Sequence, residues 1–232
     1  MIAHDTDTRQ RNTIAHHDTS HSSNVNTQIT TQDLTNLYPP QTISVPIDHF
    51  HNSTLYLPHT NDTFSLRYFF DASYYKPHGP VIVLQGGETS AVGRLPFLQK
   101  GILHDLIVAT HGIGVVIEHR YYGESIPTKD FSNENLRFLT TEQALADQVY
   151  FAKNVVFPGL ESVDLTSKTT AYLTYGGSYA GGFSAFLRKL YPDVYWGTLM
   201  RNSPTDYTDI RSYRCDCFEW CDTSNLQVLA IL

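Results

Sequence analysis

The sequence predicts an α/β fold built on a mainly parallel sheet, and two observations support this class. From Pro80 onward, short apolar runs alternate with amphipathic segments in the order strand, helix, strand, helix, strand, helix. The runs at 81–84 and 113–118 are almost continuously apolar, as expected of strands that are buried between two layers of helices. Such an order favours parallel strands joined by right-handed crossovers.

Two further strands are expected before this alternating part. Residues 42–47 and 63–70 alternate partly between apolar and polar positions, so we expect half-exposed antiparallel strands at the edge of the sheet. After the strand at 81–84, apolar residues recur at helical spacing through 94–110. This spacing predicts one amphipathic helix between the two apolar strands.

The second half of the alternating part follows the same order. Thr140 and Gln143 have the spacing of a capping box, so a helix is expected from there to about Val156. Residues 169–175 read as the next strand and 179–191 as the next helix.

The charged and aromatic segment 118–124 lies at the end of an expected strand, where α/β folds bind ligands. We nevertheless expect a structural role, in which Arg120 pairs with a carboxylate, because buried charges require partners.

Composition and charge exclude several classes of protein. A chain of 232 residues with 41% apolar residues buries roughly 70% of its unfolded surface, which is enough for one sizeable core. The net charge of −7 and the lack of Lys/Arg clusters argue against a nucleic acid partner or an anionic membrane surface. No apolar run approaches the roughly 18 residues of a membrane-spanning helix.

The first 40 residues read as a disordered tail, because apolar residues are scattered there and no signal peptide is visible. Two glycosylation sequons, at Asn52 and Asn61, would nevertheless suit a secreted protein.

No metal site and no cofactor are expected. His49 and His51 alternate as on one face of a strand, but two imidazoles lack the further ligands that zinc requires. Cys215, Cys217 and Cys221 lack a paired Cys-x-x-Cys spacing, and no histidine follows them. Their odd number leaves at least one cysteine unpaired within the chain.

Ser178 is the clearest candidate for chemistry. It lies between an expected strand and an expected helix, in the hexapeptide Gly176-Gly177-Ser178-Tyr179-Ala180-Gly181. A serine becomes a nucleophile when it is exposed, aimed and served by a base. Gly176 and Ala180 provide the small residues that a tight strand-to-helix turn needs, so the segment is a variant of the nucleophile elbow of α/β-hydrolases. An ordinary glycine-serine turn is the alternative.

An acyl-transfer site also needs two backbone N–H groups that point at the developing oxyanion. Tyr179, directly after the serine, would supply one of them. Gly87 is the favoured source of the other and Gly86 the second choice, because glycine lets the backbone approach a substrate closely. The alternative is a glycine turn that only ends a strand.

The base of a triad is missing from this sequence. In α/β-hydrolases the acid and the histidine follow the nucleophile along the chain, yet all eleven histidines precede Ser178. We therefore expect the catalytic Asp and His to be absent from these residues, and the chain alone to be inactive. His119, the nearest in sequence, is the possible exception, because a triad is defined by its geometry.

Four segments together resemble the proline-specific serine carboxypeptidase family, which includes lysosomal Pro-X carboxypeptidase, dipeptidyl peptidase II, thymus-specific serine protease and secreted fungal members. They are Asp48-His49-Phe50, Glu118-His119-Arg120-Tyr121-Tyr122-Gly123-Glu124-Ser125, Leu139-Thr140-Thr141-Glu142-Gln143-Ala144-Leu145-Ala146-Asp147 and the hexapeptide at 176–181. The resemblance covers about 45–198, whereas members of the family are roughly twice as long as this chain.

The resemblance implies an α/β-hydrolase fold, here incomplete, with a helical cap and C-terminal strands missing. It implies a serine exopeptidase that cleaves next to proline through an acyl-enzyme on Ser178, with the Tyr179 N–H as an oxyanion donor, and secretion or a lysosomal location. We expect a tail at 1–40, a partial domain at 41–198 and a divergent tail at 199–232. A non-catalytic binding module and an esterase are the alternatives.

Overall fold

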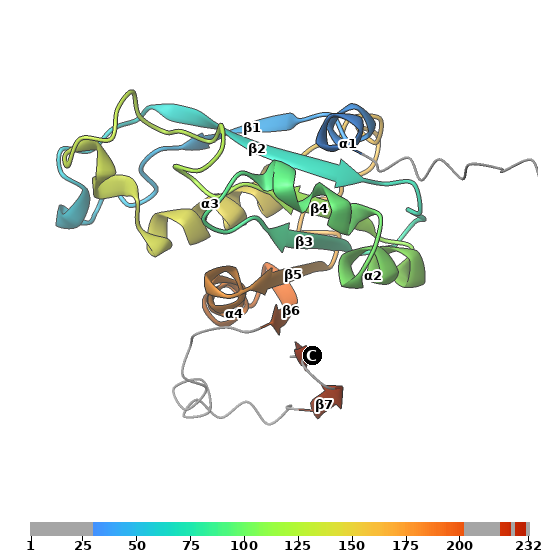
Figure 1. Cartoon of the computed structure of the whole chain (residues 1–232). Coiled ribbons are helices and arrows are strands. Elements are labelled where there is room, and N and C mark those ends of the chain that lie inside the picture. Colours follow the sequence, from blue (N-terminus) through green and yellow to red (C-terminus); the bar gives the residue numbers. More distant parts are fainter. Residues whose placement is uncertain (1–29, 202–218, 224–225, 231–232) are drawn as a thin grey trace, which may run out of the picture.

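The computed structural model describes residues 30–201, 219–223 and 226–230 (Figure 1). The main sheet has the strand order β1-β2-β4-β3-β5-β6. Its strands are β1 (Gln41–Pro46), β2 (Thr63–Asp71), β3 (Val81–Gln85), β4 (Ile113–Ile117), β5 (Tyr172–Gly177) and β6 (Tyr195–Arg201). Strands β3 to β6 pair in parallel, while β1 and β2 are antiparallel. The expected fold class, an incomplete α/β-hydrolase fold, is confirmed.

Helices cover the sheet from both sides. The α-helices are α1 (Thr31–Leu37), α2 (Ile102–Thr110), α3 (Thr141–Asn154) and α4 (Tyr179–Leu190). Short 3-10 helices are η1 (Thr54–Tyr56), η2 (Ala91–Leu98) and η3 (Asn135–Phe138). A second, two-stranded sheet pairs β7 (Glu219–Thr223) with β8 (Leu226–Ala230). Within the described ranges, no helix is both long enough and apolar enough to span a bilayer.

Alternate residues of β3 enter two separate cores, which explains why the strand is apolar throughout. Val81 and Val83 pack in a cluster with α3 and α4, whereas Ile82 and Leu84 pack with α1, η2 and α2. Because side chains alternate across a strand, these two clusters are the two faces of the sheet. The expectation of a strand buried between helical layers is confirmed.

Two expectations about the first strands and helices were wrong. The helix expected through 94–110 is interrupted, because η2 ends at Leu98 and Gly101 adopts a φ of 81° before α2 begins. Strand β2 is not half-exposed at the edge: it lies between β1 and β4, and its Leu66, Tyr68 and Phe69 are all buried. Of these two strands only β1 lies at an edge of the sheet, so the partial alternation in the sequence of β2 did not predict its burial correctly.

Part of the expected tail is a helix. In α1, Thr30 and Asp33 form a capping box through their side chains and backbone N–H groups. Leu34 and Tyr38 are buried against the core that contains η2. The rest of the expected tail, 1–29, lies outside the described residues.

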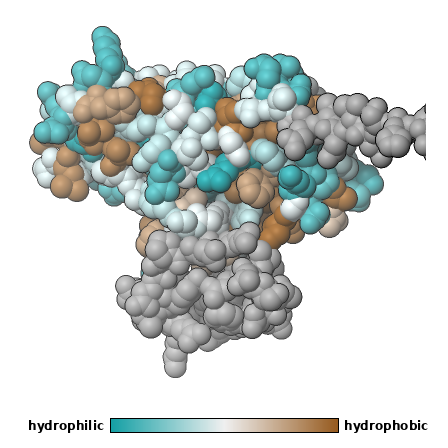
Figure 2. All heavy atoms as spheres, in the orientation of Figure 1, coloured by the Kyte–Doolittle hydropathy of each residue, from teal (hydrophilic) through white to brown (hydrophobic). Residues whose placement is uncertain are grey.

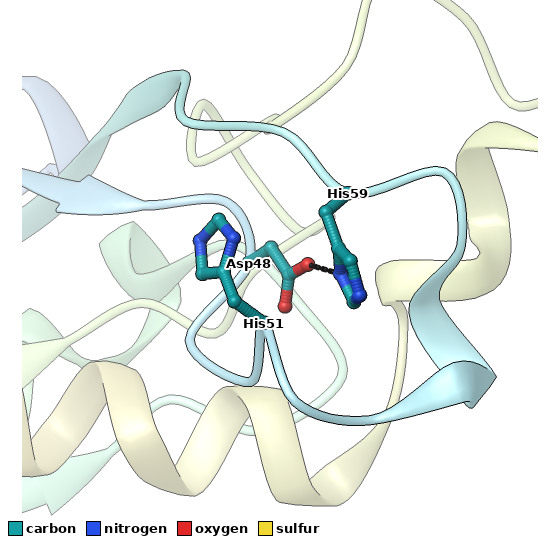
Figure 3. A group of neighbouring side chains, drawn as sticks. All are labelled: Asp48, His51 and His59. Atoms are coloured by element: carbon teal, nitrogen blue, oxygen red, sulfur yellow. Dashed lines mark hydrogen bonds and ion pairs between the residues drawn. The ribbon is translucent and has the colours of Figure 1, made fainter.

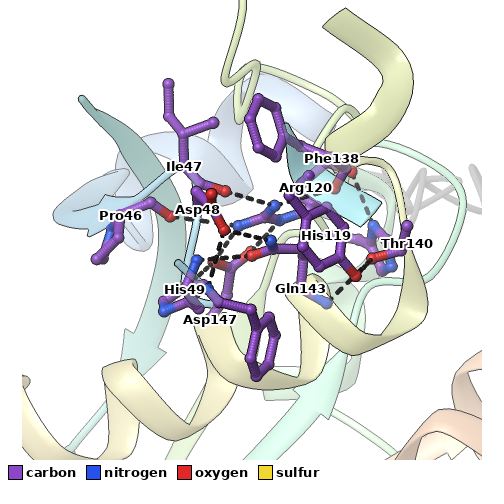
Figure 4. A network of polar contacts seen from close by, with 12 residues as sticks. Pro46, Ile47, Asp48, His49, His119, Arg120, Phe138, Thr140, Gln143 and Asp147 are labelled. Carbon is purple, nitrogen blue, oxygen red and sulfur yellow. Dashed lines mark hydrogen bonds and ion pairs between the residues drawn. The ribbon is translucent and has the colours of Figure 1, made fainter. Parts of the chain in front are cut away.

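A fully buried guanidinium ties four segments together (Figure 4). The side chain of Arg120 donates two hydrogen bonds of 2.7 Å to Asp147 of α3. Its other N–H groups donate to the carbonyls of Pro46, Ile47 and Phe138 at 2.9 to 3.3 Å. The expected pairing of Arg120 with a carboxylate is confirmed, and every N–H of the guanidinium has an acceptor.

Glu118, two residues earlier, is the centre of a second buried network. Its carboxylate accepts bonds of 2.6 and 3.0 Å from Arg67 of β2. The backbone N–H groups of Ala91 and Glu124 and the hydroxyl of Ser125 donate to it as well. Burial alone would raise the pKa of Glu118, but the bonds from Arg67 and these N–H groups lower it below the ordinary value of 4.5.

One group of exposed apolar residues lies at one end of the molecule. Figure 2 shows brown residues at the left, where Figure 1 places the loop between β1 and β2. In this loop Leu55 and Leu57 are 75% and 56% exposed. Burial of these two side chains therefore contributes little to holding the loop, whereas Tyr56 between them is buried in the core.

We predict that Glu118→Gln lowers the free energy of unfolding at pH 7 and makes this free energy depend less on pH in the acid range. A lowered folded-state pKa means that the unfolded state binds more protons below pH 4.5, so the wild type loses stability as pH falls through the folded pKa. At pH 7 the substitution removes the buried charge partner of Arg67 and leaves only the exposed Glu124, a cost of up to about 3–5 kcal/mol. Urea unfolding at pH 7 and at pH 4 measures both effects.

Glu124→Gln is the matched control, because Glu124 also pairs with Arg67 (2.8 Å) but its side chain is 77% exposed. An exposed pair contributes less than about 1 kcal/mol. Equal losses of unfolding free energy in the two variants would contradict the assignment of Glu118 as the buried partner.

Candidate active site

Ser178 occupies a tight turn between β5 and α4, as the sequence predicted. Strand β5 ends at Gly177 and α4 begins at Tyr179, so the serine is the single residue between them. It is exposed, and its φ of 56° and ψ of −130° are rare for a residue with a side chain. Strain of this kind is typical of functional turns, because it aims a side chain outward from the end of a strand.

The small residues around Ser178 are required by the geometry of the turn. A Cβ atom on Gly176 would overlap the carbonyl of Ala180, so no side chain fits at this position. The N–H of Gly181 donates to the carbonyl of Ser178 at 2.9 Å, which closes the first turn of α4. Ala180 is buried below the turn. These contacts explain the pattern of the hexapeptide.

The glycine loop after β3 lies beside this turn. Gly87 is buried with a φ of 72°, and a Cβ atom placed on it would lie 3.6 Å from the side chain of Ala180. The N–H of Gly86 instead donates to the carbonyl of Ile117 at 2.9 Å, so it continues the ladder between β3 and β4. The structure therefore brings Gly87 to the elbow and engages the N–H of Gly86 in the sheet.

A pocket of about 420 Å³ joins the two loops. Its lining residues are Leu84, Gln85, Gly87, Glu88, Arg94, Phe97, Tyr175, Gly177, Ser178 and Ala180. The apolar part of the lining comes from the sheet and from η2, and the charged part from Glu88 and Arg94. The nucleophile candidate thus faces a hollow that holds both an acidic and a basic side chain.

The side chain of Tyr179 is fixed by His119 at the end of β4. His119 Nδ1 lies 2.8 Å from the carbonyl of Arg120, so this nitrogen carries the hydrogen. Burial lowers the pKa of His119, so the ring is neutral and its Nε2 accepts the hydroxyl hydrogen of Tyr179 at 3.1 Å. The hydroxyl of Thr141 lies 3.3 Å from that of Tyr179. Tyr179 is thereby held from β4 and from α3.

No imidazole in the described part of the chain hydrogen-bonds the hydroxyl of Ser178. His119, the exception considered from the sequence, uses both ring nitrogens for Arg120 and Tyr179. The geometry therefore gives no support for His119 as the base.

The remaining candidate residues from the sequence are placed as follows. Asn52 and Asn61 are both exposed, as glycan acceptors must be. His49 and His51 do not share the face of a strand, because β1 already ends at Pro46. Cys215 and Cys217 lie outside the described residues, as does the side chain of Cys221.

Sequence reasoning missed the role of Gln143. Its N–H bonds the hydroxyl of Thr140, but its side chain does not return to Thr140 as in a full capping box. It instead accepts from the N–H of His49 and donates to Asp48, both at 2.9 Å. The side chain thus joins α3 to the Asp48-His49-Phe50 segment. This contact spans more than 90 residues along the chain, so no local sequence pattern predicts it.

Comparison with known proteins agrees with this geometry. The family described as Serine carboxypeptidase S28 matches residues 45–213. A probable extracellular serine carboxypeptidase of Arthroderma benhamiae is 62% identical over 174 residues, which is 75% of this chain and 24% of that protein. Human lysosomal Pro-X carboxypeptidase is 33% identical over 164 residues, 68% of this chain and 30% of that protein.

The crystal structure of a probable hydrolytic enzyme from Pseudomonas aeruginosa PAO1 aligns with a TM-score of 0.46 and 13% identity, over 77% of this chain and 46% of the other. The chain spans about a quarter to a third of the length of the two carboxypeptidases above. On the family match and these relatives, the chain belongs to the serine carboxypeptidase S28 family.

Proposed function

We propose that this protein is a serine-type exopeptidase of proline-containing peptides, in which Ser178 forms the acyl-enzyme. The observation that carries the proposal is the strained, exposed turn at Ser178 beside the glycine loop, in a chain of the S28 family. The preference for proline rests on the likeness to human lysosomal Pro-X carboxypeptidase. Secretion or a lysosomal location is inferred in the same way from this relative and the extracellular one.

In the proposed mechanism the Ser178 hydroxyl attacks the carbonyl carbon of the scissile bond. The negative charge that develops on the carbonyl oxygen requires preorganised N–H donors. Tyr179 supplies one, because the first N–H groups of a helix have no acceptor within it. Gly87 supplies the other, since the N–H of Gly86 is bonded to Ile117. The alcohol's proton must pass to a base and then to the leaving amine.

That base is assigned to neither His119 nor any other histidine of these 232 residues. In the fold, the acid and the histidine follow the nucleophile along the chain, and no histidine follows Ser178 here. An oxyanion hole and substrate binding alone leave roughly 10³–10⁴-fold catalysis over water. These residues by themselves are therefore expected to have negligible peptidase activity.

The first prediction here concerns the 232-residue chain. We expect no measurable turnover of a proline-containing peptide and no labelling by a fluorophosphonate probe, because both need an activated serine. A longer S28 relative, such as the human enzyme, is the positive control for both assays. Turnover by the chain that is lost in both Ser178→Ala and His119→Ala would contradict the prediction and identify His119 as the base.

In an active longer form, Ser178→Ala is expected to lower kcat on the peptide by about 10⁶-fold, as removal of a nucleophile does elsewhere. Hydrolysis of a p-nitrophenyl ester without cleavage of the peptide would favour the esterase alternative. A longer form that binds the peptide but neither cleaves it nor reacts with the probe would favour the binding module.

A further prediction concerns the support of the oxyanion donor. Tyr179→Phe keeps the backbone N–H but removes the hydroxyl that bonds His119 and Thr141. In an active form we expect kcat to fall roughly 10-fold with KM unchanged, less than the ~10²–10³-fold that follows loss of a donor. Tyr122→Phe is the matched control, because its ring lies 5.5 Å from that of His119 without a hydrogen bond between them. Equal kinetics for the two variants would refute the role of the hydroxyl.

A further inference from the structure

We propose that Asp48, His51 and His59 form a binding site for a zinc ion in the loop between β1 and β2 (Figure 3). One ligand atom of each side chain lies within 4.8 Å of the others. Two imidazoles and one carboxylate are a ligand set that zinc accepts, with a fourth position left for water. This site is independent of the proposed chemistry at Ser178.

The carboxylate of the site is held in place from behind. Asp48 is 1% exposed, and its Oδ1 accepts bonds of 2.9 Å from the N–H of Phe50 and from the side chain of Gln143. Its Oδ2 is left to face His59, whose Nδ1 lies 2.6 Å away. Hydrogen bonds to the second oxygen of a ligating carboxylate orient it and are typical of metal sites.

The loop that carries the two histidines is also fixed. The N–H of Ile47 donates to the carbonyl of Asp62 at 3.0 Å, which closes the base of the loop. Arg137 of η3 donates to the carbonyls of Tyr56 and Pro58, the latter at 2.7 Å. His59 follows directly after this anchor. These polar contacts, together with the burial of Tyr56 in the core, hold the ligands near one another.

The two imidazoles lie on either side of the carboxylate. Figure 3 shows His51 and His59 flanking Asp48, and their ring centroids are 5.3 Å apart. Zinc requires ligand bonds of about 2.0–2.2 Å, so the close contact between Asp48 and His59 must widen slightly to admit the ion. His51 is exposed and free to turn toward the ion.

A purely structural bond between Asp48 and His59 is the competing explanation, and His51 separates the two. Within the described residues, His51 makes no hydrogen bond. Its ring lies 5.3 Å from that of His59, but a bond between Asp48 and His59 does not require it. Zinc binding needs it as the third ligand. His51→Asn is therefore the decisive variant. Because the His51 side chain is exposed, its substitution is not expected to change the stability of the fold.

The test is isothermal titration of Zn²⁺ into the metal-free chain in a background that removes other ligands. That background carries His4→Asn, His16→Asn, His17→Asn, His21→Asn, Cys215→Ser, Cys217→Ser and Cys221→Ser. We expect one Zn²⁺ per chain and a rise in Tm on binding. His51→Asn should weaken binding at least tenfold and leave the Tm of the metal-free chain unchanged.

His59→Asn is expected to weaken Zn²⁺ binding to a similar degree. His111→Asn is the control, because His111 is exposed, lies outside the cluster and has a φ of 52° that asparagine tolerates. It should bind Zn²⁺ like the background chain. No binding in the background chain, or unchanged binding in His51→Asn, would overturn the proposal.

Discussion

The buried pair of Arg120 and Asp147 is the contact on which the arrangement of this half of the fold depends. The guanidinium extends from the end of β4 and reaches α3, η3 and the segment after β1 through five hydrogen bonds. Loss of one partner of such a pair leaves a buried charge without compensation, which costs about 3–5 kcal/mol. The pair thus fixes α3 and the β1–β2 loop relative to the central sheet.

The site inherits its rigidity from this pair through neighbouring residues. His119 bonds the carbonyl of Arg120, and its other nitrogen accepts from Tyr179, the residue next to Ser178. Thr141 bonds the same tyrosine and belongs to α3, the helix that Asp147 anchors. Ligands of α/β folds bind outside the carboxyl ends of the strands. Here three consecutive buried polar residues follow β4. Glu118 bonds Arg67 of β2, Arg120 bonds Asp147 of α3, and His119 between them bonds Tyr179 at the elbow.

The elbow could be predicted from the sequence because its requirements are local. Gly176 and Ala180 meet within four residues, and the clash that a side chain on Gly176 would cause is decided inside the turn. The pairing of Arg120 was predictable from the cost of burying a charge, but its partner was not. Asp147 comes from a helix 27 residues later, and its register against the sheet is a matter of tertiary packing.

Features that depend on residues far apart in the chain could not be predicted from the sequence. The exposure of β2 depends on β1 covering its outer edge, and the loop site joins Asp48 to His59 across a turn with no periodicity to reveal it. The interruption of the helix expected through 94–110 is different, because it does have a local cause. The first helix ends at Leu98, and Gly101, with a positive φ, is the N-cap of the second. Hydrophobic spacing alone does not reveal such a break.

Gly86 and Gly87 lie next to each other at the end of β3 but differ in their backbone contacts. Gly86 donates to Ile117 and adds one more bond to the β3–β4 ladder. Gly87 turns away at a φ of 72° beside Ala180, so the chain leaves the sheet next to the first turn of α4. Under the proposed mechanism, the N–H of Gly87, together with that of Tyr179, stabilises the charge that develops in the transition state. Proton transfer requires a histidine, and the described residues place none within hydrogen-bond distance of the Ser178 hydroxyl.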